Sequence, residues 1–330
     1  MKKLFAALLC MVMALGVAGC ESPSESDVTE KTYTIAAVDG APALAIADLY
    51  DGYVFDNGSE KVKIETKIIP SAQTLQASMI NGDYDMAVMP LNMASILYNK
   101  GIKVKLASVN IFGVLYLVGT DEASSLSDLK GKVVYNLGQG GTPDYSFRYI
   151  LDRNNIKYEV GDEVKNGDTV YLQYVTAGSE LIPLLKAGTA KYGILGEPAV
   201  TMANQKTGSK ILFDLQAEWK KINSNLNYVQ AGIIVSDKIY SDDALLNGIL
   251  SKLGGNNTFL TENVGNLKTL LTGNGSSLTV DFTTDILKRC NLDCKKAADV
   301  KADVNNYLSV LYGYNKASVG GKLVDDGFYC

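Results

Sequence analysis

Strand-like runs that end in a proline-containing turn and continue into a helix-like segment recur along this chain. The prolines of these turns are Pro42, Pro70, Pro90, Pro143 and Pro198. Alternating strands and helices with short connections predict an α/β fold with a mostly parallel sheet. In open sheets of this kind, ligands bind beyond the carboxyl ends of the strands. We therefore expect these turns to converge on a ligand-binding cleft.

The stretch 131–146, with the sequence GKVVYNLGQGGTPDYS, shows this pattern most clearly. The residues from Val133 to Tyr135 are strand formers, and the glycines between Gly138 and Gly141 allow a turn with positive φ. Thr142 suits a helix N-cap and Pro143 suits the first helical position. The turn either offers backbone N–H groups to an anionic or polar ligand or only makes a tight connection. Its spacing matches neither a P-loop nor the dinucleotide-binding fingerprint, which disfavours a nucleotide ligand.

The beginning of the chain is predicted to be a secretory signal followed by a lipid anchor. Lys2 and Lys3 precede an apolar run over 4–19 that is too short for a comfortable membrane span. The run ends in VAGC, which resembles the lipobox of bacterial lipoproteins, with valine in place of the commoner leucine. We predict a signal peptide at 1–19 and lipidation of Cys20, which would hold the protein on the outer face of the cell membrane. The alternative is an ordinary secreted protein in which Cys20 is incidental.

The composition excludes several classes of function. The chain contains no histidine, which excludes Ser-His-Asp and Cys-His catalysis and nearly all zinc sites. Its net charge of −5 and its scattered basic residues argue against nucleic acid as a partner. The hydrophobic content of 47% is enough for one large domain or two medium domains. We expect neither a metal ion nor a cofactor.

The cysteines predict at least one unpaired thiol. If the signal removes Cys10 and lipid occupies Cys20, three remain, Cys290, Cys294 and Cys330. A disulfide between the first two of these requires the CNLDC stretch to leave helical geometry, because the two side chains must point at one another. Whether they are bridged is left open by the sequence.

An internal repeat predicts two similar lobes. A helix, a glycine stop and a buried strand occur at 75–89 and again, at a fixed offset, at 181–195. Two long apolar runs, 108–119 and 228–235, are expected to be buried strands that carry the chain between the lobes. The lobes would close on a ligand by rotation about the segments near 113–119 and 231–235. The expected organisation is a flexible acidic tether at 20–31, lobe 1 at 32–118 and 229–330, and lobe 2 at 119–228.

Short motifs along nearly the whole chain carry a family resemblance. They are the lipobox, DGAPA after the first strand, GDYDMAVMP, GQGGTP, GEPA and the closing SVGGKLVDDGFY. Together they resemble ABC-importer substrate-binding proteins of the nitrate/sulfonate/taurine/bicarbonate and thiamine-pyrimidine-precursor type. The resemblance implies a type II periplasmic-binding-protein fold, with two α/β lobes joined by two crossing strands. It also implies a monomeric lipoprotein that delivers a small organic solute to the permease and ATPase subunits of an importer.

The resemblance also implies which residues face the ligand. Carried over by position, they are Asp39, Gly40, Ala41, Ser71, Gln73, Pro90, Asn92, Gly138, Gln139, Gly140, Gly141, Thr142, Thr176 and Glu197. Asp39 and Glu197 would repel a simple anion unless they cap helices or face an amine, and no lysine or arginine lies among these turns. We therefore expect a ligand with both an acceptor and an amine or amide-like donor.

Arginine, the best clamp for a carboxylate or sulfonate, is scarce in this sequence. Only Arg148 lies near a proposed turn. Asp144, Arg148 and Asp152 follow one another at i, i+4 spacing, which favours a surface ion-pair ladder over a role in binding. Trp219 is expected to pack in the core or to stack on a ligand.

An enzymatic function is the alternative. The same fold resembles enzymes of menaquinone biosynthesis and synthases of the thiamine pyrimidine, but both act inside cells and the latter use a histidine as reactant. Asp39 and Glu197 could serve as an acid and base pair, although capping a helix or binding a ligand donor is the simpler role. An adhesion lipoprotein would not need convergent turns on two lobes. We expect the protein not to be an enzyme.

Overall fold

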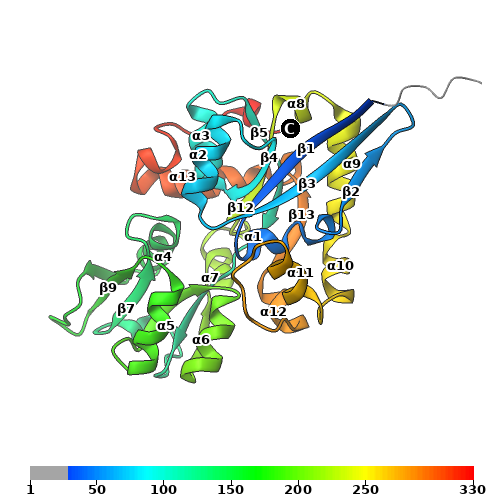
Figure 1. The fold of residues 1–330 in the computed structure, drawn as a ribbon. Coiled ribbons are helices and arrows are strands. Elements are labelled where there is room, and N and C mark those ends of the chain that lie inside the picture. The colour runs from blue at the N-terminus through cyan, green and yellow to red at the C-terminus, as the bar shows by residue number, and fades with distance from the viewer. Residues whose placement is uncertain (1–28) are drawn as a thin grey trace, which may run out of the picture.

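The computed structural model describes residues 29–330, which form two α/β lobes, each built on its own sheet (Figure 1). The two-lobed α/β fold expected from the sequence is confirmed. The expected signal peptide at 1–19, the lipidation site Cys20 and the tether up to residue 28 lie outside the described residues. We call lobe 1 the part built on the seven-stranded sheet and lobe 2 the part built on the six-stranded sheet.

The sheet of lobe 1 is mixed. In sequence order its strands are β1 (Thr29–Val38), β2 (Tyr53–Asp56), β3 (Glu60–Ile69), β4 (Met86–Pro90), β5 (Val104–Ile111), β12 (Ala231–Ser236) and β13 (Leu292–Lys296). Across the sheet the order is β13-β5-β12-β4-β1-β3-β2. β1 runs parallel to β3 and β4, whereas β12 runs antiparallel to β4 and β5. The central strand β4 is buried from Met86 to Met89, which explains its continuous apolar sequence.

Strand β1 begins inside the stretch expected to be tether. In its parallel pairing with β3, Thr29 lies opposite Glu60 and Lys31 lies opposite Val62. Lys31 also forms an ion pair with Glu60. The last residues of the expected tether 20–31 therefore belong to a strand, because β3 offers them a complete row of backbone partners.

Helices cover both faces of the lobe 1 sheet. They are α1 (Ala41–Leu44), α2 (Ala72–Asn81), α3 (Leu91–Asn99), α8 (Asp237–Tyr240), α9 (Asp243–Gly254), α10 (Asn256–Glu262), α11 (Leu267–Gly273), α12 (Thr284–Arg289) and α13 (Lys301–Tyr314), with 3-10 turns η1 (Ala47–Leu49), η3 (Ala297–Val300), η4 (Lys316–Val319) and η5 (Asp326–Phe328). α2, α3 and α13 share a core with Ala36 and Ala87. α1, α9, α10 and α12 share a second core with Ile35 and Val88 on the opposite face.

Lobe 2 has the same layered plan. Its strands are β6 (Leu115–Gly119), β7 (Val133–Leu137), β8 (Lys157–Val160), β9 (Thr169–Val175), β10 (Tyr192–Gly196) and β11 (Lys210–Asp214), in the order β11-β6-β10-β7-β9-β8. Its helices are α4 (Thr142–Arg153), α5 (Gly178–Ala187), α6 (Ala199–Thr207) and α7 (Leu215–Ile222), with the 3-10 turn η2 (Leu126–Leu129). α4 and α7 pack in the core that also serves lobe 1, and α5 and α6 pack on the other face.

The internal repeat corresponds to a helix, a glycine and a central strand in each lobe. Helix α2 ends at Gly82 with φ 77° before β4, and α5 ends at Gly188 with φ 74° before β10. Both glycines adopt the left-handed conformation that closes a helix, which explains why a glycine recurs there. β4 and β10 each deliver a turn to the inner side of their lobe.

The run 108–119, expected to be one buried strand, is two strands in different sheets. Gly113 lies between β5 and β6 at φ 85°. A side chain at this position would also stand 3.0 Å from the side chain of Gln216, so the site requires glycine. The chain crosses between the lobes at 112–114. Lobe 2 thus begins before the expected residue 119, because β6 pairs with β10 and β11.

Two glutamine side chains join the crossing segments. Gln216 of α7 donates its amide N–H to the carbonyl of Phe112 and accepts the N–H of Tyr228 at 2.7 Å. Gln230, just before β12, accepts the N–H of Val114 at 2.6 Å through its side-chain oxygen. Gln216 bonds to both segments and Gln230 joins them directly, so both crossings are held as a pair.

Helix α13 makes a further connection between the lobes. Its Tyr307 lies among Trp219 and Tyr228, and all three rings are fully buried. Near the end of the helix, Tyr314 stacks on Tyr145 of α4 with ring centroids 5.6 Å apart. Figure 1 shows α13 above α4 on the left of the view. The lobes therefore share one continuous apolar core on this side.

The described cysteines form no disulfide with one another. Cys290 is buried at the end of α12, and Cys294 lies in β13. Burial raises the pKa of the Cys290 thiol, which keeps it protonated and unreactive. Cys290 and Cys294 are therefore not bridged to one another.

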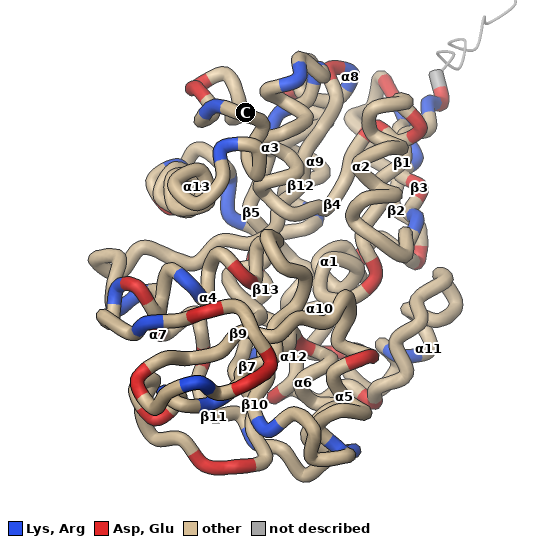
Figure 2. The backbone as a smooth tube through the Cα atoms, turned by 90° about the vertical axis from the view of Figure 1, so that its left-hand side faces the viewer, with Lys and Arg blue, Asp and Glu red and all other residues tan. Residues whose placement is uncertain are grey.

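Charged residues of both signs are interspersed over both lobes in the view of Figure 2. This arrangement agrees with the scattered charge pattern of the sequence. Over residues 29–330, none of the helices combines the length and the apolar character needed to span a membrane.

Candidate functional site

A cavity of about 450 Å³ lies between the two lobes. Its walls are Asp39, Gly40, Ala41, Pro42, Gln73, Pro90, Asn92, Met93, Ile111, Val114, Leu137, Gly138, Gly141, Thr142, Pro143, Thr176, Glu197, Gln230 and Ala231. Most of these residues follow the carboxyl ends of β1, β3, β4, β7, β9 and β10, and the rest belong to the crossing segments. The volume lies within the range of small-molecule sites in proteins.

The structure brings together most of the residues predicted to face a ligand. Those that line the cavity are Asp39, Gly40, Ala41, Gln73, Pro90, Asn92, Gly138, Gly141, Thr142, Thr176 and Glu197. Ser71, Gln139 and Gly140 are not part of its wall. Ser71 instead caps helix α2 by accepting the N–H of Thr74 at 3.2 Å. A part in binding stays a prediction for the residues that line the cavity.

Asp39 lies at the cavity wall with its carboxylate already occupied. Ser276 donates its hydroxyl to one carboxylate oxygen at 2.5 Å. Ser277 donates both its N–H, at 2.8 Å, and its hydroxyl, at 2.6 Å, to the other. Charge-assisted hydrogen bonds of this kind are about twice as strong as those between neutral groups. Asp39 therefore ties the turn after β1 to the loop that follows α11.

Glu197 is likewise occupied, and its partner comes from the other lobe. Its fully buried side chain accepts the Nε–H of Arg289 at 2.6 Å. It also accepts the hydroxyl of Thr201 at 3.0 Å and the N–H of the same residue at 3.2 Å, at the start of α6. The expectation that no arginine offsets this carboxylate is wrong, because Arg289 reaches it from α12, distant in the sequence.

Asp144 holds the glycine turn in place. It is fully buried at the start of α4 and accepts the N–H of Gly140 at 2.8 Å. Arg148 donates to it at 2.7 Å, and so does the hydroxyl of Tyr174, also at 2.7 Å. Burial, and next the bond to Asp144, raise the pKa of Tyr174, so its hydroxyl remains a donor.

The expected surface ion-pair ladder on α4 is therefore wrong. Asp144 faces inward rather than to solvent, and Arg148 keeps only 19% of its side chain exposed. Asp152 does not complete the ladder but accepts a hydrogen bond from Tyr314 of α13. The i, i+4 spacing is correct, but the spacing alone does not indicate which side of the helix is buried.

Several wall residues were not predicted. Met93, Ile111, Val114, Leu137 and Ala231 are apolar and have no chemical signature in the sequence. Gln230 was missed because it lies at the start of a run expected to be a buried strand. The crossing segments themselves were the available signal, since a chain that passes between two lobes must also pass the cleft.

The electrostatic character of the cavity comes from helix ends rather than from basic side chains. α2, α3 and α4 begin at the wall with Gln73, Asn92 and Thr142, respectively. Thr176 and Glu197 precede the starts of α5 and α6. Helix N-termini favour negative or hydrogen-bond-accepting groups. Among the described residues, no lysine or arginine contributes to the wall.

Solved structures with similar folds come from ABC importers. A protein described as an ABC transporter from Parabacteroides distasonis is 26% identical, with a TM-score of 0.75 over 91% of this chain and 98% of that one. The periplasmic aliphatic sulphonate binding protein SsuA from Escherichia coli is 13% identical, with a TM-score of 0.64 over 89% and 95%. The ligand binding component of an ABC-type import system from Staphylococcus aureus, solved with zinc bound, is 10% identical, with a TM-score of 0.58 over 90% and 98%.

These similarities confirm the expected fold, which is the type II periplasmic-binding-protein fold of ABC-importer substrate-binding proteins. No protein-family model and no curated protein matches the chain. Of the two structures of lower identity, one is named an aliphatic sulphonate binding protein and the other was solved with zinc bound. The shared fold therefore leaves the identity of the ligand to the chemistry of the cavity.

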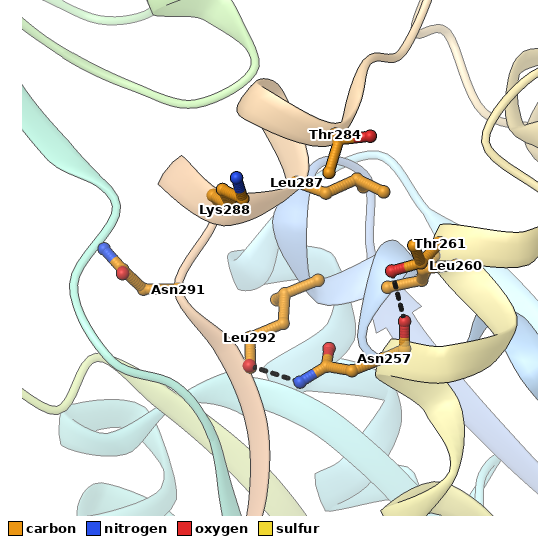
Figure 3. A pocket seen from close by; sticks show the side chains of 8 residues that line it. All are labelled: Asn257, Leu260, Thr261, Thr284, Leu287, Lys288, Asn291 and Leu292. Carbon is orange, nitrogen blue, oxygen red and sulfur yellow. Dashed lines mark hydrogen bonds between the residues drawn. The ribbon is translucent and has the colours of Figure 1, made fainter.

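A second cavity, of about 440 Å³, lies in lobe 1 between α10 and α12 (Figure 3). Asn257 donates its side-chain amide to the carbonyl of Leu292 at 2.8 Å, and Thr261 donates its hydroxyl to the carbonyl of Asn257 at 2.8 Å. None of the residues predicted to face a ligand lines this cavity, and the two hydrogen bonds drawn in Figure 3 both involve Asn257.

Proposed function

We propose that this chain is the substrate-binding lipoprotein of an ABC importer. It captures a small organic solute between its two lobes and delivers it, as a monomer, to the permease and ATPase subunits. The observation that supports this function is the cavity between the lobes, to which the carboxyl ends of strands from both sheets contribute. In a fold shared with importer binding proteins, this is the place where a solute would contact both lobes at once.

The wall of the cavity indicates the chemistry of the solute. Met93, Ile111 and Leu137 offer an apolar surface, whereas the starts of α2, α3 and α4 favour an acceptor or an anionic end. The side-chain oxygen of Asn92 has no hydrogen-bond partner among the described residues, so it is available to a donor. We propose a small organic solute with an apolar body, an acceptor or anionic end and one donor.

The amine expected from the sequence to neutralise Asp39 and Glu197 is not required. Both carboxylates already accept charge-assisted hydrogen bonds from Ser276, Ser277 and Arg289. Sulfonates are the first class to test, since the similar protein from Escherichia coli binds aliphatic sulphonates. Aminosulfonates and aminopyrimidines remain within the same chemistry.

A thermal-shift screen of the purified mature protein tests this function. The compounds are alkanesulfonates, taurine, nitrate, aminopyrimidines and flavin precursors. A solute present at a hundred times its dissociation constant should stabilise the folded state by about 2.7 kcal/mol, which gives a measurable rise in melting temperature. An Asn92→Leu variant should respond less to the solute that stabilises the wild type. A screen in which only compounds unrelated to importer solutes stabilise the protein would contradict the proposal.

We propose a non-enzymatic role as well. A general acid or base must be free to exchange a proton with a substrate, whereas Asp39 and Glu197 are each held by several donors. The solutes that stabilise the protein should therefore be recovered unchanged after prolonged incubation with it, as mass spectrometry would show. Conversion of such a solute at a rate proportional to protein concentration would contradict this role.

Lipid attachment at Cys20 yields a prediction for cells. A chain with the native sequence should partition with membranes, whereas Cys20→Ala should appear in the periplasm or the medium, because lipid provides its only proposed membrane contact. The measurement is fractionation followed by immunoblotting. Cys330→Ala serves as a matched control and should remain in the membrane fraction. Membrane retention of Cys20→Ala would show that the anchor lies elsewhere.

A further inference from the structure

The two lobes touch through two different contacts beside the cleft. At α13, the contact combines the buried rings of Trp219, Tyr228 and Tyr307 with hydrogen bonds such as that of Tyr314 to Asp152. At α12, the contact is polar and centres on Arg289, whose guanidinium reaches from lobe 1 to Glu197 in lobe 2. Figures 1 and 2 both show α12 and α6 apart from α13 and α4.

The polar contact is built around one guanidinium. Nε of Arg289 donates to Glu197 at 2.6 Å, and Nη2 donates to the hydroxyl of Thr201 at 3.0 Å. Thr201 itself donates to Glu197, so the three side chains form a closed set of hydrogen bonds. Arg289 is the only member of this set that belongs to lobe 1. Separation of the lobes at this side therefore breaks the side-chain bonds of Arg289, together with the hydrogen bond that the hydroxyl of Tyr116 in lobe 2 donates to the carbonyl of Arg289 at 2.8 Å.

The two partners of this contact differ in burial, which allows the contact to break when the lobes separate. The side chain of Glu197 is fully buried, whereas 30% of the Arg289 side chain is exposed. When the lobes separate, the guanidinium can enter water, and Glu197 keeps its bonds to Thr201 at the start of α6. Separation at α13, in contrast, would expose three aromatic rings to water and would also break the hydrogen bonds of Tyr314 to Asp152 and of Asn315 to Tyr145.

Glu197 links this contact to the ligand, because it also lies in the wall of the cavity. If lobe 2 moves away from Arg289, it carries Glu197 and the start of α6 away from the residues of lobe 1 at the cavity, such as Asn92. The contact thus lies at the cavity wall, apart from the shared aromatic core and next to the first crossing segment, where the N–H of Glu197 donates to the carbonyl of Val114 at 3.0 Å.

We propose that Arg289 is a positioning residue for solute capture, which holds lobe 2 closed over the cavity by binding Glu197 and Thr201. Lobe 2 opens on the α12 side and remains attached on the α13 side. The link to a solute rests on the proposed function. The closure itself does not, and it can be measured without any ligand.

The test compares variants of the mature protein by hydrogen exchange and small-angle scattering, in the absence of added solute. Arg289→Met keeps the length of the side chain but removes its hydrogen bonds. We expect amide exchange of residues 138–142 to become roughly tenfold faster or more, since a hydrogen bond to a charged group contributes at least that factor. The radius of gyration should increase. Exchange in α13 and α7 should stay unchanged.

Three further variants separate positioning from general stability. Lys288→Met removes the neighbouring exposed charge and should match the wild type in both measurements. Arg289→Lys should restore slow exchange in part, because an ammonium can still reach Glu197. Glu197→Gln keeps the shape of its side chain and should resemble Arg289→Met. If Arg289→Met fails to fold, Glu197→Gln tests the contact in its place.

Unchanged scattering and unchanged exchange at 138–142 in Arg289→Met or Glu197→Gln, whatever the melting temperature, would overturn the proposal. Faster exchange in α13 equal to that at the cavity would also overturn it, because the α13 side would then not be the pivot. Failure of the solute screen would instead contradict the proposed function, and the closure measurement would be unaffected.

Discussion

Replacing Trp219 by alanine is expected to lower the free energy of unfolding by about 3 to 5 kcal/mol, as for other large aromatic truncations in protein cores. Trp219 is fully buried, and its ring lies 4.9 Å from that of Tyr228 and 5.2 Å from that of Tyr149. Within the described residues its indole N–H has no hydrogen-bond partner, so the loss comes from packing. Urea denaturation measures it.

Two controls define this result. Trp219→Phe should cost less than the alanine variant, because it keeps a ring against Tyr228 and removes an indole N–H that has no partner. Val54→Ala, at a position that is 50% exposed, should change stability by at most about 0.5 kcal/mol. If Trp219→Ala were no less stable than Val54→Ala, the shared core between the lobes would not exist as described.

Replacing Asp144 by alanine should also cost about 3 to 5 kcal/mol, because it leaves a largely buried arginine without its partner. Arg148 would lose its carboxylate, and Tyr174 and Gly140 would lose their acceptor. Two effects follow: the free energy of unfolding of the protein falls, and the glycine turn at 138–142 loses the hydrogen bond that holds it to α4. Urea denaturation gives the first effect, and amide exchange over 138–142 gives the second.

The matched comparison is an exposed ion pair in the same lobe. Asp121 lies 3.7 Å from Lys191, and about half of each side chain is exposed. Asp121→Ala should cost no more than about 1 kcal/mol, as surface pairs usually do. Similar losses for Asp121→Ala and Asp144→Ala would mean that Asp144 is a surface residue, as the ladder interpretation has it.

The position of the site could be predicted because it follows from the sheet. The carboxyl ends of parallel strands meet at one edge, so the turns at Asp39, Pro90, Thr142 and Glu197 had to approach one another once two lobes were recognised. Local turn chemistry supplied the rest of the argument, since glycine and proline have few alternative roles at such positions.

What could not be predicted depends on partners that are distant in the sequence. Arg289 meets Glu197 across the cleft, and Ser276 meets Asp39 from the loop after α11. No spacing rule connects such pairs. Without them, both carboxylates were expected to cap a helix or to bind a ligand group. Each is held by the protein itself, and Glu197 accepts the N–H of Thr201 at the start of α6.

Two errors have a more local origin. The run 108–119 looks like one buried strand because apolar residues continue through Gly113, and only the positive φ at that glycine divides it between two sheets. On α4, the spacing of Asp144 and Arg148 fits an exposed ladder as well as a buried pair. The hydroxyl of Tyr174 in strand β9 bonds to both side chains, which identifies them as a buried pair.

The central claim is that a small organic solute binds between the lobes. A crystal structure of the mature protein with the solute that gives the largest thermal shift tests it most directly. We predict density for the solute in contact with Asn92 of lobe 1 and with Gly141 and Thr142 of lobe 2. Density for the same solute elsewhere, for example in the lobe 1 cavity beside Asn257, with the cleft between the lobes free of it, would contradict the claim.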